Sequence, residues 1–207
     1  MSAMSDAPRS KSPFRKVTRA DLNVVARTLG RAFADDPVWL WVMGHRTDMA
    51  QRTGRLMAAL AKDTMASHDT VLMSNSGEAV AVWVPPGGSQ ISLIDQVKLA
   101  PATVRALGLR ELRKIPVLTA MDKHHPKVPH WYLMILGADP NHQRKGFGRM
   151  LVEPMLERAD ADGVVAYLES SKETNVPYYR SFGFEVTREQ PIAPGGPILW
   201  LMERPPR

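Results

Sequence analysis

The fold is decided by the stretch Gln143-Arg144-Lys145-Gly146-Phe147-Gly148, because of what lies on either side of it. An unbroken apolar run precedes it, from Trp131 to Leu136, and is typical of a strand that is buried on both faces. A helical pattern follows it, from about Gly146 to Ala161, and Gly163 marks the end of that helix. A further apolar run at 164–168 predicts the next strand, so this part of the chain reads as a strand–helix–strand unit.

The stretch also has the composition of a phosphate-binding helix start. The first turn of a helix carries free backbone N–H groups and the positive end of the helix dipole. Gly146 and Gly148 would let phosphate oxygens approach the main chain, while Arg144, Lys145 and Arg149 add positive charge. The same residues would also make a simple glycine-eased turn into a helix. The dinucleotide fingerprint and the P-loop are both excluded, because the third glycine and the Gly-Lys-Ser/Thr sequence that they need are missing.

Working outward from this unit, hydrophobic periodicity predicts a mixed order of α and β elements, with strand–helix–strand units in the C-terminal half. Strands are expected at 14–17, 71–74, 79–84, 131–136, 164–168, 184–187 and 198–202. Helices are expected from 18 to about 35, at 49–65, at 92–123 with interruptions at Pro101, Gly108 and Pro116, at 146–161 and at 176–181. We expect a single domain over residues 14–207, preceded by a disordered tail at 1–13.

Composition narrows the function classes. The chain has 207 residues, 44% hydrophobic and 23% charged, which is ordinary for a globular protein. No apolar run approaches the ~18–20 residues of a membrane helix, so no membrane partner is expected. The absence of cysteine excludes a disulfide framework, a thiolate metal site and a cysteine nucleophile, and it fits a cytoplasmic location. His124 and His125 lack further ligands at metal spacing, so no metal is expected.

The formal net charge of +6 leaves two interpretations open. It describes either a basic surface without a partner or a surface that attracts a polyphosphate. Aromatic residues are not interleaved with the basic ones, and we therefore expect no nucleic-acid partner.

The glycine stretch resembles the Gln/Arg-x-x-Gly-x-Gly/Ala signature of the GCN5-related N-acetyltransferase (GNAT) superfamily, in which it grips the pyrophosphate of acetyl-CoA. A second segment, Asn175 to Phe184, resembles the C-terminal segment of that family, with Asn before a short helix and Tyr four residues before Gly-Phe. The resemblance implies that Tyr179 protonates the leaving CoA thiolate. A phenol has an unperturbed pKa near ~10 and is a weaker acid than a thiol, so it must be positioned at the sulfur to help.

The resemblance also implies the rest of a cofactor site. In the family, the strand before the glycine stretch splays from its neighbour, and the freed main chain binds the acetyl carbonyl and the pantetheine amides. The matching residues here are Leu136, Gly137 and Ala138, although a plain strand end would explain them as well. The other expected acetyl-CoA contacts are Gln143, Arg144, Lys145, Gly146, Phe147, Gly148, Arg149, Asn175 and Tyr178.

Within the superfamily, the chain resembles the puromycin N-acetyltransferase type. The likeness runs through His125-Pro126-Lys127, Trp131, Leu168-Glu169-Ser170 and Asn175 to Phe184. Two stretches on the acceptor side, 36–66 and 91–120, match poorly. The identity of the acceptor therefore does not carry over.

Acidic and aromatic residues are the candidates for binding the acceptor. Glu169 ends the strand beside the cofactor strand and is a candidate general base or amine-binding residue, or else a salt-bridged surface residue. Asp35 and Asp36 would attract an amine, but they precede Pro37 and would equally cap a helix there. The tryptophans at 39, 83 and 131 (Trp39, Trp83, Trp131) would line an apolar pocket or simply fill the core.

The resemblance implies an α/β (α+β) GNAT fold, with a mixed central sheet of about six to seven strands and helices on both faces. Together with the candidate residues, it implies direct transfer of an acetyl group from acetyl-CoA to a primary amine of a small molecule, in a ternary complex and without a metal. The protein is expected to be a monomer or a homodimer. Two alternatives stay open at this stage: a protein lysine or N-terminal acetyltransferase on the same scaffold, and an acyl-CoA-binding sensor without catalysis.

Overall fold

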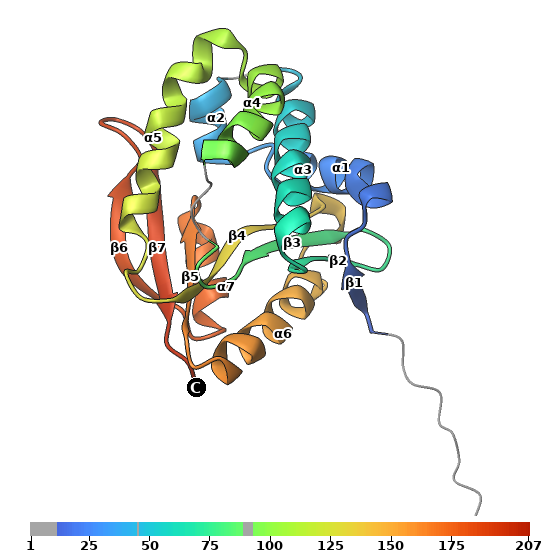
Figure 1. Cartoon of the computed structure of the whole chain (residues 1–207), viewed down its shortest axis with the longest axis vertical. Coiled ribbons are helices and arrows are strands. Elements are labelled where there is room, and N and C mark those ends of the chain that lie inside the picture. The colour runs from blue at the N-terminus through green and yellow to red at the C-terminus, as the bar shows by residue number, and fades with distance from the viewer. Residues whose placement is uncertain (1–11, 45, 89–92) are drawn as a thin grey trace, which may run out of the picture.

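A seven-stranded sheet forms the centre of the computed structural model, which describes residues 12–44, 46–88 and 93–207 (Figure 1). The strand order across the sheet is β1-β2-β3-β4-β5-β7-β6. The strands lie at Phe14–Lys16 (β1), Val71–Ser74 (β2), Ala79–Val84 (β3), His130–Ala138 (β4), Val165–Ser170 (β5), Glu185–Pro191 (β6) and Ile198–Arg204 (β7). Neighbouring strands are antiparallel except for β4 and β5, which are parallel. The expected mixed α/β architecture is confirmed.

Helices cover both faces of this sheet. The α-helices lie at Leu22–Ala32 (α1), Pro37–Met43 (α2), Met49–Ser67 (α3), Leu93–Leu107 (α4), Ile115–Thr119 (α5), Phe147–Ala161 (α6) and Val176–Arg180 (α7). Short 3₁₀ helices lie at Arg19–Asp21 (η1), Leu109–Lys114 (η2), Ala120–His124 (η3), Pro140–His142 (η4) and Glu173–Asn175 (η5). Figure 1 shows α1 and α3 on one side of the sheet and α6 on the other, with α2, α4 and α5 extending the first layer beyond the strands.

Helix α6 is held by the apolar stripe that its sequence predicts. Five of its side chains are buried at helical spacing: Leu151, Val152, Met155, Leu156 and Ala159. They share one cluster with buried side chains of the central strands, including Trp83 and Trp131. Full burial of an aliphatic side chain stabilises a fold by ~1.5–3 kcal/mol, so this stripe anchors the helix that follows the glycine stretch.

Two glycines bring α1 and α3 into close contact on the opposite face. A Cβ atom added at Gly30 would collide with the backbone carbonyl of Ala50, and one at Gly54 would collide with the carbonyl of Ala26. Only glycine allows the two backbones to approach this closely. This packing places α3 over the middle of the sheet, where it becomes one wall of the cavity described below.

Strand β4 contains an irregularity that shapes both faces of the sheet. Val82 of β3 pairs with Ile135, whereas the next residue, Trp83, pairs with Leu133, so Met134 is an extra residue on β4. A bulge of this kind reverses the alternation of side chains along a strand. Leu133 accordingly packs in the cluster beneath α6, while Ile135 packs in the cluster beneath α3.

Strands β4 and β5 also part from each other. Their parallel pairing runs from His130↔Val165 to Leu133↔Leu168. Beyond that point β4 pairs with β3, and β5 pairs with β7. The separation begins at the bulge, so the central strands open where β4 leads into the glycine stretch.

Some element boundaries differ from the sequence-based expectation. The strands at 71–74 and 79–84 are confirmed, and the strand expected at 131–136 extends to both sides. The predicted interruptions at Pro101 and Pro116 are wrong, since α4 continues through Pro101 and Pro116 lies in the first turn of α5, where proline is tolerated. The break at Gly108 is confirmed, with a φ of 79° that favours glycine. Most of the expected tail, residues 1–11, lies outside the described residues.

Candidate active site

The glycine stretch forms an open concave turn at the start of α6. Gly146 is the N-cap residue of the helix, and its φ of 85° lies in the left-handed region. A Cβ atom at this position would meet no heavy atom within 4 Å, so the space next to the backbone is free. Arg144 also has a positive φ, of 61°. Left-handed residues alternating with right-handed ones direct successive N–H groups into a concave anion site.

Basic side chains surround this turn and are exposed. The guanidinium of Arg149 lies 4.6 Å from the ring centroid of Phe182, and it donates to Glu153 Oε1 at 2.7 Å and to Ser181 Oγ at 3.1 Å. The Lys145 ammonium donates to the Asn141 carbonyl at 3.1 Å. These contacts hold two cations beside the helix start, where they reinforce the positive end of the dipole.

Tyr178 reaches the same turn from α7. Its hydroxyl is buried and has no hydrogen-bond partner among the described residues. A Cβ atom at Gly148 would lie 2.6 Å from that hydroxyl oxygen, so glycine is required at 148 for the tyrosine to fit. Burial raises the pKa of Tyr178 to about 12. A buried hydroxyl without a partner is costly, which makes it a candidate ligand group.

Tyr179, the expected proton donor, lies deeper than Tyr178. Its ring packs edge-on against Phe184, with centroids 6.2 Å apart, and against Tyr178 at 5.3 Å. Burial raises the pKa of Tyr179 as well, so its phenol keeps its proton at neutral pH. Asn175, at the start of α7, is exposed.

These features form a setting that fits the phosphates and the pantetheine arm of acetyl-CoA. The open Gly146 turn and its cations suit a pyrophosphate, and the unpartnered Tyr178 hydroxyl suits a polar ligand atom. Leu136, Gly137 and Ala138 pair with β3 on one side only, which leaves the edge facing β5 available to an amide-bearing chain. The Gln143 amide donates to the Ala138 carbonyl at 3.3 Å and thereby ties the turn to the end of this strand.

A large cavity lies on the α3 side of the same opening. Its volume is about 530 Å³, and apolar side chains make up most of its wall. The lining residues are Phe33, Asp36, Val38, Trp39, Leu56, Met57, Leu60, Ala100, Thr103, Val104, Leu107, Leu112, Ile115, Thr119, Asp122, Tyr132, Met134, Ile135, Glu169, Ser171, Ile192 and Leu199. Both bulge residues, Met134 and Ile135, belong to this wall, so the cavity adjoins the point where β4 and β5 part.

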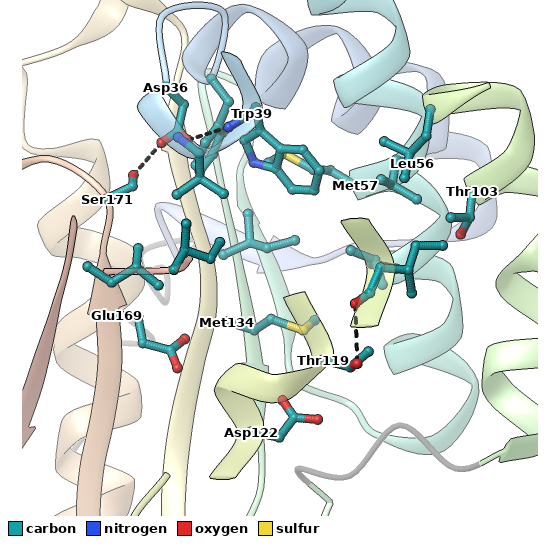
Figure 2. Close-up of a pocket in the computed structure, with 18 of the residues that line it drawn as sticks. Asp36, Trp39, Leu56, Met57, Thr103, Thr119, Asp122, Met134, Glu169 and Ser171 are labelled. Carbon is teal, nitrogen blue, oxygen red and sulfur yellow. Dashed lines mark hydrogen bonds between the residues drawn. The ribbon is translucent and has the colours of Figure 1, made fainter. Parts of the chain in front are cut away.

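Glu169 and Asp122 face one another across one part of the cavity (Figure 2). The carboxylate of Glu169 accepts hydrogen bonds from the hydroxyls of Tyr132, at 2.7 Å, and Tyr167, at 3.0 Å. His125 Nε2 lies 3.3 Å from Glu169 Oε1. Partial burial raises the pKa of Asp122, with His125 opposing the rise and Glu169 adding to it. The cavity therefore carries negative charge in otherwise apolar surroundings.

Asp36 lines another part of the cavity (Figure 2). It is the N-cap of α2, and its Oδ1 accepts from the backbone N–H groups of Val38 at 3.0 Å and Trp39 at 3.1 Å. Its other oxygen accepts from the hydroxyl of Ser171, which follows β5. Burial raises the pKa of Asp36 even though these hydrogen bonds lower it. Asp36 thus both caps the helix and joins two walls of the cavity.

The structure brings together only part of the expected acceptor site. Asp36, Trp39 and Glu169 line the cavity, whereas Asp35 is exposed and pairs with Lys172 at 2.6 Å. The expectation for the other two tryptophans is corrected, because they lie in the α6-side core and do not line the cavity. Trp83 is fully buried there, and Trp131 donates its indole N–H to Asp162 at 2.8 Å.

Sequence reasoning missed five polar residues of this site: Asp122, His125, Tyr132, Tyr167 and Ser171. They come from three segments, at 122–125, at 132 and at 167–171, and share no local motif. Tyr132 and Tyr167 are directly paired in the β4–β5 register, and this pairing sets their hydroxyls on one carboxylate. Alternation would have placed Tyr167 and Glu169 on one face, but it would not have identified their partners.

Comparison with known proteins decides the family. The model of the acetyltransferase (GNAT) family matches residues 101–184. An uncharacterised N-acetyltransferase of Schizosaccharomyces pombe is 30% identical over 182 residues, which cover 82% of this chain and 73% of the relative. The chain belongs to the GNAT acetyltransferase family. It is an N-acetyltransferase, and the family uses acetyl-CoA as its acetyl donor.

Solved GNAT-fold structures resemble this chain over nearly its whole length. The histone acetyltransferase HPA2 and related acetyltransferase from Corynebacterium glutamicum aligns with a TM-score of 0.64 at 24% identity, covering 94% of this chain and 96% of the other. Arylalkylamine N-acetyltransferase 2 from Aedes aegypti aligns with a TM-score of 0.60 at 16% identity, covering 94% of this chain and 98% of the other. At these identities the likeness establishes the GNAT fold.

Across residues 12–44, 46–88 and 93–207, no group of three or more His, Cys, Asp or Glu side chains is arranged to hold a metal ion. Within the same ranges, no helix of this GNAT chain is long and apolar enough to cross a membrane.

Proposed function

We propose that this GNAT enzyme transfers the acetyl group of acetyl-CoA to the primary amine of a small molecule with an apolar body, directly and in a ternary complex. One observation carries the proposal. An apolar cavity of about 530 Å³, with carboxylates in its wall, adjoins the opening between β4 and β5. Pockets of ~300–1,000 Å³ are typical for small ligands.

The charge of the cavity suits a protonated amine. Glu169, Asp122 and Asp36 are its acidic lining residues, and none of the lining residues that the structure describes is a lysine or an arginine. In surroundings of low polarity a carboxylate attracts an ammonium group more strongly than it would in water. We therefore expect the amine to enter as a cation and to come to rest beside Glu169.

The shape of the cavity favours a small acceptor over a segment of protein. Residues of α4, η2 and α5, including Leu107, Leu112 and Ile115, line the cavity together with residues of the sheet. A flexible peptide would need an open groove along the sheet edge. The α4–α5 region instead forms a wall, which supports the small-molecule alternative among those left open by the sequence.

The chemistry divides between two residues. Acetyl-CoA supplies an activated acetyl thioester when bound. Glu169 would accept the proton that the ammonium must lose before its nitrogen can attack, and Tyr179 would donate the proton that the departing thiolate needs. Each residue is suited to its role, because Glu169 lines the cavity and the phenol of Tyr179 keeps its proton at neutral pH.

The test is a comparison of acceptor classes with purified protein and acetyl-CoA, following CoA release. The panel contains primary arylalkylamines and alkylamines, the matched N,N-dimethyl amines, lysine peptides and peptides with free N-termini. We expect turnover with the apolar primary amines and none with their dimethyl counterparts. Turnover confined to peptides would overturn the proposal in favour of a protein acetyltransferase. Acetyl-CoA binding without turnover of any acceptor would favour a sensor.

A further inference from the structure

Two histidines adjoin Glu169 without being among the residues that line the cavity, and the proposed function does not use them. His125 Nε2 is 3.3 Å from Glu169 Oε1, and His125 Nδ1 is 3.4 Å from His130 Nε2. His130 Nδ1 is in turn 2.8 Å from the Val128 carbonyl oxygen. These groups form a continuous row from a backbone carbonyl to the carboxylate that lines the cavity.

The orientation of the His125 ring is set by its neighbours. The ring centroid is 4.5 Å from that of Tyr132, 4.7 Å from that of Tyr167 and 5.5 Å from that of His130. The side chain is 8% exposed and Glu169 is 11% exposed. Packing on three rings holds one imidazole nitrogen against the carboxylate and the other against His130.

The positions of the hydrogens along the row follow from the Val128 carbonyl oxygen at its end. A carbonyl oxygen can only accept, so His130 Nδ1 carries a hydrogen, and in neutral His130 the Nε2 atom accepts. His125 Nδ1 must then donate to His130, which leaves His125 Nε2 without a hydrogen in the neutral ring. Two acceptors, His125 Nε2 and Glu169 Oε1, therefore face one another. Burial lowers the pKa of His130, which disfavours an additional proton on that ring.

We propose that His125 is a positioning residue that shares with Glu169 the proton removed from the substrate ammonium. The N–H bond of the ammonium breaks, and its proton comes to lie between Glu169 Oε1 and His125 Nε2. The amine becomes neutral and the carboxylate–imidazole pair changes from a net charge of −1 to 0, so charge is conserved. This proton makes a hydrogen bond between His125 Nε2 and Glu169 Oε1, the one contact in the row that otherwise has no hydrogen between its two atoms.

The charged and titratable groups around this pair come from several elements. Tyr132 on β4 and Tyr167 on β5 donate to the carboxylate, and burial raises the pKa of both phenols, so neither competes for the proton. Asp122 on η3 faces the pair from the cavity side. Glu203 on β7 adds a negative charge near His130 and Tyr167. His124 lies nearby but turns away, with its Nδ1 3.1 Å from Arg188.

The inference rests on the proposed role of Glu169, and a measurement on the resting protein tests it separately. Histidine labelled with ¹⁵N reports by NMR which imidazole nitrogen carries the hydrogen, and the His125→Ala spectrum identifies the His125 signals. At alkaline pH, where the ring is neutral, we expect His125 to carry its hydrogen on Nδ1 and none on Nε2. A neutral His125 with its hydrogen on Nε2 would overturn the inference, whatever the acceptor is.

Kinetics with an accepted amine provide the second test. In His125→Ala we expect kcat/KM to fall by about tenfold or more, and the acidic limb of its pH profile to move down by about one unit, because a carboxylate alone is a weaker base than the pair. Added imidazole should restore part of the loss by filling the vacated site. His124→Ala is the matched control, since it removes a neighbouring histidine outside the row. Its profile should equal that of the wild type.

The outcomes separate three explanations. If His125→Ala keeps acetyl-CoA affinity but its acidic limb does not move, His125 has only a packing role and the inference is wrong. If the limb moves and imidazole restores activity, the shared proton is supported. If Glu169→Gln retains full activity with every amine, the proposed base itself is wrong, independently of the tautomer seen by NMR.

Discussion

The two halves of the proposed active site are built in opposite ways. The turn that we propose for the cofactor is one contiguous stretch, Gln143 to Arg149, whose glycines and cations are neighbours in the chain. The acceptor cavity is assembled from residues that range from Phe33 to Leu199, most of them apolar and without any local signature. The proposed task of the first half, holding acetyl-CoA, is common to the family. The second can diverge freely, because no single segment defines it.

This difference explains why the sequence alone predicts the turn proposed for the cofactor but does not predict the acceptor cavity. A phosphate site needs backbone N–H groups, and a glycine-rich helix start supplies them locally. A pocket for an apolar amine needs only volume, low polarity and a few charges, which many combinations of side chains provide. Substitutions in the two halves should therefore affect different steps, and the following experiments test that separation.

The largest effect is expected at the carboxylate of the cavity. Glu169→Gln keeps the size of the side chain but removes its charge, and kcat/KM for an accepted amine should fall ~10²–10⁴-fold, the usual contribution of a general base. Acetyl-CoA affinity, measured by calorimetry, should stay unchanged. Glu189→Gln, on the exposed part of β6, is the control. A simultaneous loss of acetyl-CoA binding would show that the two halves are not separable.

The cofactor turn should show the converse behaviour. In Gly146→Glu, the left-handed backbone conformation at position 146 becomes less favourable by ~1–2 kcal/mol, because glutamate has a Cβ atom. The added carboxylate also repels the phosphates of acetyl-CoA, so the affinity for acetyl-CoA should fall about 100-fold. Gly163→Glu is the matched control, because Gly163 also has a positive φ and open space and lies just beyond the other end of α6. Its calorimetric affinity should equal that of the wild type. Equal losses in both variants would mean that general destabilisation is the cause.

The volume of the cavity predicts a smaller, acceptor-specific effect. Leu60→Trp would fill part of the space beside α3, and kcat/KM for a bulky arylalkylamine should fall about tenfold while that for a short alkylamine changes less. Lys62→Trp, two residues along the same helix and exposed, controls for the added ring. Steady-state kinetics with both amines measure the ratio. An equal fall for the two amines would mean that they do not occupy this cavity.

The smallest expected effect is on stability at Asp36. Asparagine also caps helices, so Asp36→Asn should change the free energy of unfolding at neutral pH by less than about 1 kcal/mol. Burial raises the folded-state pKa of Asp36, so its favourable contribution is complete below the unfolded-state pKa and is lost as pH rises through the folded-state pKa.

Urea unfolding between about pH 3 and pH 7 measures this contribution, since unperturbed Asp side chains titrate at the lower end of that range. The stability of the wild type relative to Asp36→Asn should decrease as pH rises. A constant difference between the wild type and Asp36→Asn would contradict the role of burial at this carboxyl.

Local patterns in the sequence determined the glycine stretch, the amphipathic face of α6 and most strands. Each of these depends on residues that are neighbours in the chain, because helix and strand periods are set by the backbone itself. The same holds for Gly108, which ends α4. Pro101 shows the limit of such rules, since tertiary packing carries α4 past a residue that usually ends a helix.

Only the tertiary structure decided which residues form the acceptor site. The parallel register of β4 and β5 places Tyr132 beside Tyr167, and the extra residue Met134 turns both itself and Ile135 toward the cavity. The same folding packs His125 beside Glu169 and buries Trp83 and Trp131 in the core on the α6 side of the sheet. Register, bulges and layer assignment depend on contacts between segments far apart in the chain, and the local sequence therefore does not specify them.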